Sequence, residues 1–195
     1  AQSGASEQDE IITTGTRRKA RSAADTPAPV DVISGAEFTN QASNDLQDLL
    51  RTSVPSYNVN TQPISDAATI IRPANLRGLS PDNTLVLLNG KRRTRGSVIS
   101  FLGGGIADGA QGADVAVFPA LAIKQVEVLR DGASSQYGSD AIAGVMNFKL
   151  KDASSGGSAE VVYGSTYEGD GENKRVSGNI GLPLGDQGFV NITAE

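Results

Sequence analysis

The side chains that carry most enzyme chemistry are sparse in this chain of 195 residues, which has no histidine and no cysteine. Their absence excludes Ser-His-Asp and Cys-His catalysis, thiolate metal sites and disulfides. The glycine-rich stretch at residues 103–112 contains neither G-x-G-x-x-G nor G-x-x-x-x-G-K, so it is not predicted to bind phosphate. Glu168, Asp170 and Glu172 have the chemistry to bind calcium, and an acidic hairpin turn explains them equally well. We therefore expect no enzyme, no cofactor and no metal.

Positive charge is concentrated in two short clusters, although the net charge of the chain is −5. The clusters consist of Arg17, Arg18, Lys19 and Arg21, and of Lys91, Arg92, Arg93 and Arg95. Neither cluster alternates with aromatic residues as in proteins that bind single strands, and a negative net charge opposes binding to phosphate backbones. We expect no binding to nucleic acid.

The N-terminal part is predicted to contain a single short strand. Residues 1–9 are small and polar, so we expect a disordered tail. Residues 10–15 are rich in β-branched side chains and predict a strand. This strand is either an edge strand of the domain or a segment that pairs with the sheet of a partner. Residues 17–29 end in a Pro/Ala linker.

Short helices and buried strands are predicted in the following part of the chain. The spacing of Ser34 and Glu37 is that of a capping box, and Ser43 precedes an apolar stripe of leucines, so we expect two short helices between residues 36 and 52. Runs of apolar residues predict strands at residues 30–34, 84–88, 125–129 and 144–150. The connection at residues 91–116 is long for a segment without regular structure, and such loops are usually functional or disordered.

Strict alternation of apolar and polar residues begins after residue 156. Val161 and Tyr163 face one way in the predicted strand, and Glu160 and Gly164 face the other. Two more strands repeat the pattern up to residue 193. Strands of about 9 to 11 residues, apolar outside and polar inside, are typical of transmembrane barrels. Because three strands cannot close a barrel, we expect the chain to be part of a larger protein.

Two motifs resemble TonB-dependent outer-membrane receptors. VEVLRDGASSQYGSDAIAGVMNFKLK, at residues 126–151, resembles the segment that closes the plug of these receptors. The matching positions are Glu127 to Arg130, Tyr137, Gly138, Ala141, Gly144, Val145 and Asn147, and Asp131 adds a residue before Gly132. NLRGL at residues 75–79, followed by LVLLNG at residues 85–90, resembles the RGL and LVLLDG elements of the family, with Asn89 where Asp is common.

The resemblance implies an α+β fold. It consists of a plug domain with a small mixed β-sheet and short helices, followed by the first antiparallel strands of an incomplete transmembrane β-barrel. The implied divisions are a disordered tail at residues 1–9, a TonB box at 10–16, a linker at 17–29, the plug at 30–155 and barrel strands at 156–195. The implied location is the outer membrane of a Gram-negative bacterium, with the plug inside the barrel and the N-terminus facing the periplasm.

The resemblance also implies two protein contacts. The TonB box would bind the C-terminal domain of TonB through Glu10, Ile11, Ile12, Thr13, Thr14 and Gly15, because an extended segment can add a strand to TonB's sheet. Arg77, Glu127 and Arg130 are the expected plug–barrel contacts, and the two arginines fall where plugs present arginines to acidic residues on the inner wall of the barrel. Guanidinium–carboxylate pairs suit an interface that must hold and can still be broken.

The resemblance finally implies a pocket for an extracellular ligand, floored by loops at residues 57–68, 79–83 and 91–114. The expected ligand-binding residues are Asn60, Gln62, Asp82, Arg92, Arg93 and Arg95. A basic floor suits an anionic ferric siderophore or another scarce nutrient such as a glycan. Alternatively, these arginines pair with carboxylates of the barrel. The alternative for the whole chain is a soluble periplasmic binding or adhesion module without transport.

Overall fold

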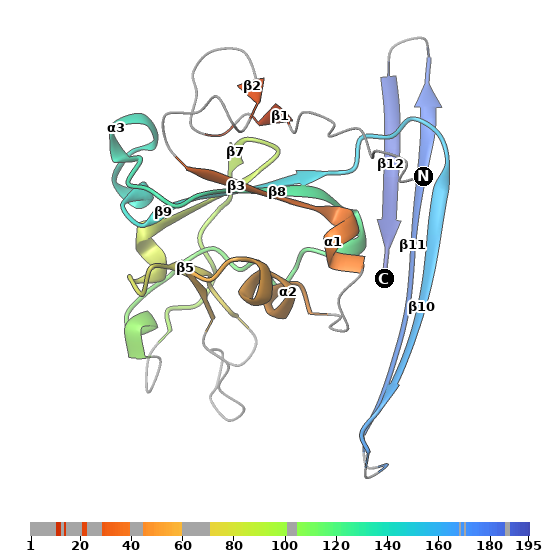
Figure 1. Cartoon of the computed structure of the whole chain (residues 1–195), viewed down its shortest axis with the longest axis horizontal. Helices are drawn as coiled ribbons and strands as arrows, with labels where there is room; N and C mark the ends of the chain where they lie inside the picture. Colours follow the sequence, from red (N-terminus) through yellow and green to blue (C-terminus); the bar gives the residue numbers. More distant parts are fainter. Residues whose placement is uncertain are drawn as a thin grey trace, which may run out of the picture.

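A mixed sheet with short helices forms the body of the protein, and three long antiparallel strands stand beside it (Figure 1). The structure is a computed structural model that describes residues 11–12, 14, 21–22, 29–39, 45–59, 71–100, 105–167, 169, 171–185 and 188–195. The expected α+β fold is confirmed. The expected tail at residues 1–9 lies outside the described residues. None of the helices in the described part is long and apolar enough to cross a membrane.

The central sheet has five strands in the order β3, β8, β9, β6, β7. Their bounds are Val30–Ser34 for β3, Thr84–Leu88 for β6, Lys91–Arg92 for β7, Ile123–Leu129 for β8 and Gly144–Leu150 for β9. The pair of β6 and β9 is parallel, and the other neighbours are antiparallel. All four predicted strands are present, and β8 begins two residues earlier than expected.

Both faces of this sheet are buried, which explains why its strands contain nearly continuous apolar runs. Val126, Met146 and Phe148 pack into a large cluster on one face. Leu129 and Val145 pack into a smaller cluster on the other face. The side-chain alternation of a strand sends successive residues to opposite faces, so each strand contributes to both clusters.

Two short helices pack against the larger cluster, as the sequence predicts. Helix α1 spans Gly35–Thr39 and α2 spans Leu46–Ser53. The capping box is formed, because the Ser34 N–H donates to Glu37 Oε2 at 2.9 Å and the Glu37 N–H donates to Ser34 Oγ at 3.3 Å. Asp45 caps α2, its carboxylate accepting from the Gln47 N–H. Ser43, from which this helix was predicted, lies outside the described residues.

The remaining elements of the body are very short. They are β1 Ile11–Ile12, β2 Arg21–Ser22, β4 Tyr57–Asn58, β5 Asn75–Leu76, η3 Pro81–Asn83, η4 Gly105–Ala107, η5 Ala120–Ala122, α3 Ser134–Tyr137 and η6 Ser139–Ala141. Strand β1 pairs with β2, and β4 pairs with β5, both antiparallel. The loops expected from residue 57 and from residue 91 therefore begin with two-residue strands. Strand β4 pairs with β5 across residues 59–74, whereas β7 pairs with β6 across the turn at residues 89–90.

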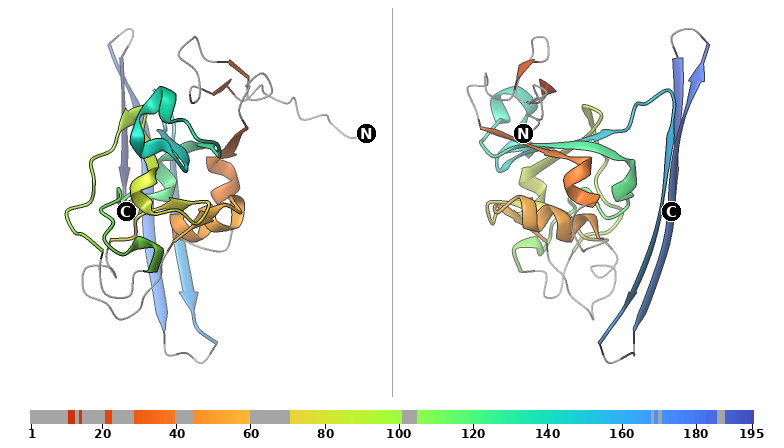
Figure 2. Two further views of the ribbon diagram at one scale, coloured as in Figure 1. Left: turned by 90° about the vertical axis from the view of Figure 1, so that its left-hand side faces the viewer. Right: turned by 45° about the vertical axis from the view of Figure 1, so that its right-hand side comes forward.

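Three strands form a separate antiparallel sheet next to the body (Figures 1 and 2). They are β10 Gly157–Ser165, β11 Glu172–Leu184 and β12 Gly188–Ala194, and we call them the wall strands. Val161 lies opposite Val176 and is 76% exposed, and Val176 is 69% exposed. Ser177, on the other face of β11, is 4% exposed. The predicted alternation is confirmed, with an apolar outer face and a polar face turned toward the body.

Candidate functional site

A buried polar pair interrupts the apolar packing of the central sheet. Glu127 on β8 lies directly opposite Asn147 on β9, and Leu87 on β6 is the next neighbour of Asn147. Glu127 is 0% exposed and Asn147 is 1% exposed. A carboxylate and an amide at such positions require hydrogen-bond partners, because burying them without partners is costly.

Thr14 is the residue that completes this pair. Its backbone N–H donates to Glu127 Oε2 at 2.9 Å, and its hydroxyl donates to the same oxygen. Asn147 Nδ2 donates to Thr14 Oγ1 at 3.1 Å and to Glu127 Oε2 at 3.2 Å. Thr14 is 1% exposed. We call Thr14, Glu127 and Asn147 the Thr14 site.

The Thr14 site was not predicted from the sequence. Thr14 and Glu127 are 113 residues apart, and Glu127 was expected to contact a barrel wall. The structure instead places its carboxylate inside the body. A signal was present, because Glu127 and Asn147 are polar residues in the middle of apolar strands. Of the other expected TonB-binding residues, Ile11 and Ile12 form β1, and Glu10, Thr13 and Gly15 lie outside the described residues.

The basic residues after β6 are divided between the two faces of the sheet. Arg92 is paired with the Asp140 carboxylate and donates to the Tyr137 carbonyl oxygen at 2.8 Å. Arg95 lies 3.8 Å from Asp140. The Arg93 guanidinium instead lies 5.8 Å from the ring centroid of Phe118, which belongs to the larger cluster on the opposite face.

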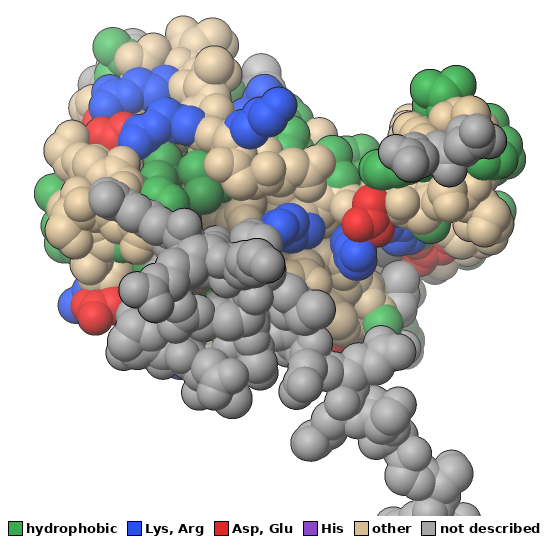
Figure 3. Space-filling model, turned by 90° about the horizontal axis from the view of Figure 1, so that it is seen from above, with side chains coloured by type: hydrophobic (Ala, Val, Ile, Leu, Met, Phe, Trp, Pro, Cys, Tyr) green, Lys and Arg blue, Asp and Glu red, His purple; other side chains and the backbone are tan. Residues whose placement is uncertain are grey.

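Arg92 therefore lies on the same face of the sheet as the Thr14 site. Leu87 is adjacent to both Asn147 and Arg92 in the strand register, so the three residues form one row. Lys and Arg side chains gather on the side of the molecule seen in Figure 3, with an acidic side chain beside them. A floor for an external ligand was expected from Arg92, Arg93 and Arg95 together, and the structure does not bring them together on one face.

The other expected ligand-binding residues lie apart from this row. Asp82 Oδ1 accepts from the Gln111 N–H at 3.0 Å and so holds the end of the glycine-rich loop. In the part of the chain that the structure describes, no ion pair links Asp82 to Arg92, Arg93 or Arg95. Asn60 and Gln62 lie outside that part.

The two arginines expected at the barrel wall differ in their environment. Arg130 Nε lies 2.6 Å from Asp31 Oδ2, and its NH2 group donates to Asp31 Oδ1 at 2.9 Å, so the pair is bidentate and connects β8 to β3. Arg77 is exposed and has a φ of 60°, next to Gly78 with a φ of 67°. A left-handed backbone at a non-glycine residue is strained, and such strain is concentrated at functional positions. Contact of either arginine with a barrel wall remains a prediction.

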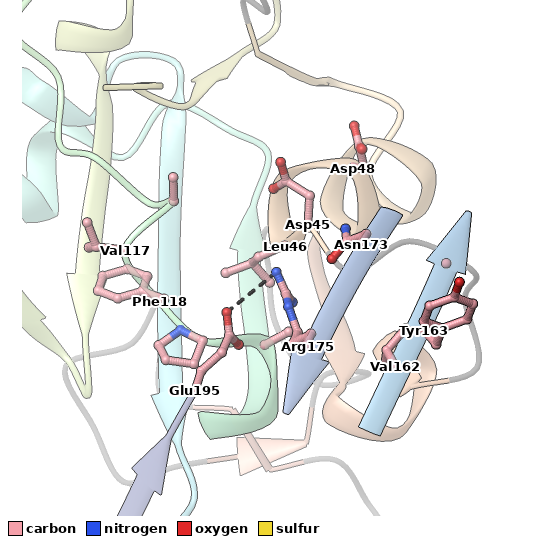
Figure 4. A pocket seen from close by; sticks show the side chains of 14 residues that line it. Asp45, Leu46, Asp48, Val117, Phe118, Val162, Tyr163, Asn173, Arg175 and Glu195 are labelled. Carbon is pink, nitrogen blue, oxygen red and sulfur yellow. Dashed lines mark ion pairs between the residues drawn. The ribbon is translucent and has the colours of Figure 1, made fainter. Parts of the chain in front are cut away.

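A cavity of about 660 Å³ separates the body from the wall strands (Figure 4). Asp45 and Asp48, at the start of α2, line it from the body, and Val162 and Arg175 line it from the wall strands. Arg175 lies 3.4 Å from Glu195. Both acidic and basic side chains line the cavity. No group of three or more acidic residues able to hold a metal ion occurs among the described residues. We regard it as the junction between the two sheets.

Comparison with known proteins identifies the body. The sequence model of the family described as TonB-dependent Receptor Plug Domain matches residues 22–145. The chain belongs to this family. The matched range contains the whole central sheet up to the start of β9, including Glu127 and excluding Thr14 and Asn147.

Similar proteins extend the match beyond the plug. The chain is 28% identical over 159 residues to the ferric enterobactin receptor of Pseudomonas aeruginosa, covering 80% of this chain and 21% of that protein. It is 30% identical over 152 residues to the ferrienterobactin receptor of Escherichia coli, covering 76% of this chain and 20% of that protein. The chain thus spans about a fifth of the length of these relatives.

Solved structures show the same fold. A crystal structure of the Pseudomonas aeruginosa ferric enterobactin receptor in complex with enterobactin has a TM-score of 0.60 and 25% identity, covering 80% of this chain and 23% of that one. The siderophore receptor PirA from Acinetobacter baumannii has a TM-score of 0.59 and 26% identity, covering 84% and 24%. The body is therefore a plug domain, and the wall strands are the start of a receptor barrel.

Proposed function

We propose that this chain is the plug and the first wall of an outer-membrane receptor for active transport. The plug gates the barrel, contributes to binding of an extracellular ligand and engages TonB for energy-dependent uptake. The chain is not proposed to be an enzyme or to hold a cofactor. The main support for the proposal is the order of the elements along the chain, because a plug domain leads directly into strands with an apolar outer face.

The outer face of the wall strands argues against a soluble binding or adhesion module. Val161, Val176 and Leu184 are each more than 60% exposed on strands of a single sheet. Water-soluble proteins rarely expose contiguous apolar surface of this extent, and strands that face lipid require it. The outer membrane of a Gram-negative bacterium supplies such an environment.

A ferric siderophore is the ligand class that we propose, because the relatives named above are ferric enterobactin receptors. Another match, 34% identical over 122 residues, is the vitamin B12 transporter BtuB of Vibrio vulnificus, so a scarce nutrient other than a siderophore is an alternative ligand. A glycan is a further alternative, because a basic loop also suits an acidic glycan. Arg93 is the basic residue we assign to the ligand side. It packs on the sheet face opposite the Thr14 site, whereas Arg92 and Arg95 lie near Asp140.

Residues 10–16 are the segment that we propose binds the C-terminal domain of TonB, and we call them the TonB-binding segment. Strand β1 within it is only two residues long and pairs only with β2 in its sheet. Addition of a strand to a partner's sheet needs an extended segment with free backbone groups and makes few demands on side chains. In this arrangement the N-terminal segment faces the periplasm.

Capture of the receptor by the isolated C-terminal domain of TonB tests this assignment. Thr13→Pro should lose binding, because proline removes a backbone donor and fixes φ. Thr13→Val is the matched control, since it keeps the N–H and the β-branched shape and should bind as the wild type does. Retained binding of Thr13→Pro would reject residues 10–16 as the TonB-binding segment.

A further inference from the structure

Residues 151–156 join β9 to the first wall strand, β10, and we call them the connector (Figure 1). We propose that Gly181, Asn191 and Asn179 are positioning residues that hold the connector on the polar face of the wall strands and thereby close one end of the space between plug and wall. We call these three residues the seat. The role of the closure in transport rests on the proposed function, whereas the seat itself rests on contacts of described residues.

Gly181 lets the connector approach the backbone of β11. It is buried, and its N–H donates to the Gly156 carbonyl oxygen at 2.9 Å, one residue beyond the register of β10 and β11. A Cβ at Gly181 would overlap the Ala153 carbonyl group, lying 2.9 Å from its carbon, and would lie 3.1 Å from Ser155 N. Because all these atoms belong to the backbone, no side-chain rotation would relieve the overlap. The path of the connector therefore requires glycine at this position.

Asn191 holds the same part of the connector by a hydrogen bond. It lies directly opposite Gly181 in the register of β11 and β12, and its Nδ2 donates to the Ala153 carbonyl oxygen at 3.2 Å. Asn179 Nδ2 donates to Asn191 Oδ1 at 2.6 Å and to Thr193 Oγ1 at 2.7 Å. The first of these bonds fixes the Asn191 amide with its Nδ2 toward the connector. Alternation along the two strands places the whole seat on one face.

The other end of the connector is fixed to the plug. The Lys151 N–H donates to the Ala122 carbonyl oxygen at 2.9 Å. Lys124 Nζ donates to both carboxylate oxygens of Asp152, at 2.9 and 3.0 Å. Exposed ion pairs contribute little to stability, so the backbone hydrogen bond is the stronger contact at this end. Only Asp152 separates the contact with the plug at Lys151 from the contact with the wall at Ala153, which leaves the connector little slack.

The seat lies beyond the cavity between plug and wall. This cavity reaches β11 at Asn173 and Arg175 (Figure 4). Gly181 follows on the same face of β11, roughly 20 Å further along the strand at about 3.3 Å per residue. Between them Ser177 is buried, and β11 contacts η5. A solute that moves along this face away from the cavity therefore meets the connector, and closure at this end requires the connector to stay on its seat.

Amide hydrogen exchange in the intact receptor tests the seat. Asn191→Asp keeps the oxygen that accepts from Asn179 and loses the donor to the connector. The Gly181 amide should then exchange roughly tenfold faster, the factor that about 1.4 kcal/mol produces. Gly181→Ala should show the same direction at its own amide, after correction for the intrinsic rate of alanine. Amides of β9 should exchange at the wild-type rate in both variants.

Gly178→Ala is the matched control for the steric argument. Gly178 lies on the opposite face of the same strand, and a Cβ there would have the Ser158 carbonyl oxygen at 4.0 Å as its nearest neighbour. Exchange at the Gly181 amide should not change in this variant.

Electrical conductance of the receptor in planar bilayers tests the closure. With KCl as the probe, and without TonB or a ligand, Asn191→Asp and Gly181→Ala should pass more current than the wild type. Gly178→Ala should pass as little as the wild type does. A purely structural role of the seat would change the exchange of β9 amides and would not separate these variants by their current.

Three results would overturn the proposal. Unchanged exchange at residue 181 in both Asn191→Asp and Gly181→Ala would refute the seat. Faster exchange of β9 amides by the same factor would make the seat only part of the general stability of the plug. Faster exchange at residue 181 with unchanged current would refute the closure.

Capture by the C-terminal domain of TonB separates this proposal from the proposed function. The wild type and both seat variants should be captured alike, because the seat lies far along the chain from residues 10–16. If none of them is captured while exchange and current rise in the seat variants, the seat and the closure stand and the assignment of residues 10–16 to TonB is wrong.

Discussion

Gly144→Ala should destabilise the plug more than Gly78→Ala does. Gly144 begins β9 with a φ of 147°. A Cβ there would lie 2.3 Å from the Leu129 carbonyl oxygen and 3.0 Å from Leu76 Cδ1. Backbone strain of this kind costs about 1–3 kcal/mol, and overpacking adds about 1–3 kcal/mol, so we expect a loss of roughly 2–6 kcal/mol.

Gly78→Ala isolates the contribution of the backbone. Gly78 has a φ of 67°, and a Cβ there would meet no atom within 4 Å. Its substitution should therefore cost only about 1–2 kcal/mol. The assay is amide exchange of the slowest β9 amides in the receptor as a function of urea, because these amides report opening of the whole plug. Equal losses for Gly144→Ala and Gly78→Ala would refute the steric argument.

Three further predictions concern Arg77, Tyr57 and Arg93. Arg77→Ala should loosen the plug from the barrel and speed amide exchange throughout the plug. The control is Arg51→Ala, because Arg51 is an exposed arginine on α2 and its loss should not change the exchange. Unchanged amide protection of the plug in Arg77→Ala would contradict the wall contact. Tyr57→Phe should stabilise the plug by about 1 kcal/mol, because the buried Tyr57 hydroxyl has no hydrogen-bond partner among the described residues. Burial, and then the charges of Asp45, Asp114 and Asp48, raise the pKa of Tyr57 above its ordinary value of 10.0. Above pH 10.0 the Tyr57 phenol releases its proton in the unfolded chain and keeps it in the folded one, so the free energy of unfolding should fall as the pH rises. Urea titrations at several pH values measure this fall. If Tyr57→Phe shows the same fall, another group is responsible. Arg93→Gln should weaken capture of an anionic ferric siderophore by roughly tenfold, while Arg92→Gln should not; direct binding measurements in which the two variants behave alike would remove the distinction between the faces.

The regular elements were predictable where local pattern and tertiary burial agree. Apolar runs identified β6, β8 and β9, and strict alternation identified the wall strands, because each strand's environment is uniform along its length. The capping box of Ser34 and Glu37 located α1 because it is a contact between residues only three apart. Strands β4 and β5 have two residues each and pair with each other across residues 59–74, so no local pattern marks them.

The candidate site was harder to predict because it depends on which face of a strand a side chain occupies. The sequence groups Arg92, Arg93 and Arg95 as one basic cluster, although alternation along the chain separates the neighbours Arg92 and Arg93 onto opposite faces. Strand β7 ends at Arg92, so alternation does not place Arg95, which lies near Asp140 with Arg92. Glu127 was expected at a wall because its motif indicates a plug, and only the register with Asn147 shows that it is internal. A polar residue inside an apolar strand indicates a buried network, yet its partner Thr14 cannot be found without the fold.

The strand order of the central sheet has a consequence for how the chain folds during synthesis. Strands β3 and β6 are the first long strands to emerge, but they do not touch, and β8 and β9 lie between them. The strand that joins the two sides, β9, is the last of the plug in sequence, only a few residues before the wall strands begin. Contacts that span so much chain form slowly. The sheet therefore stays incomplete until the ribosome has finished the plug, and a nascent chain that stops before residue 144 lacks its central strand.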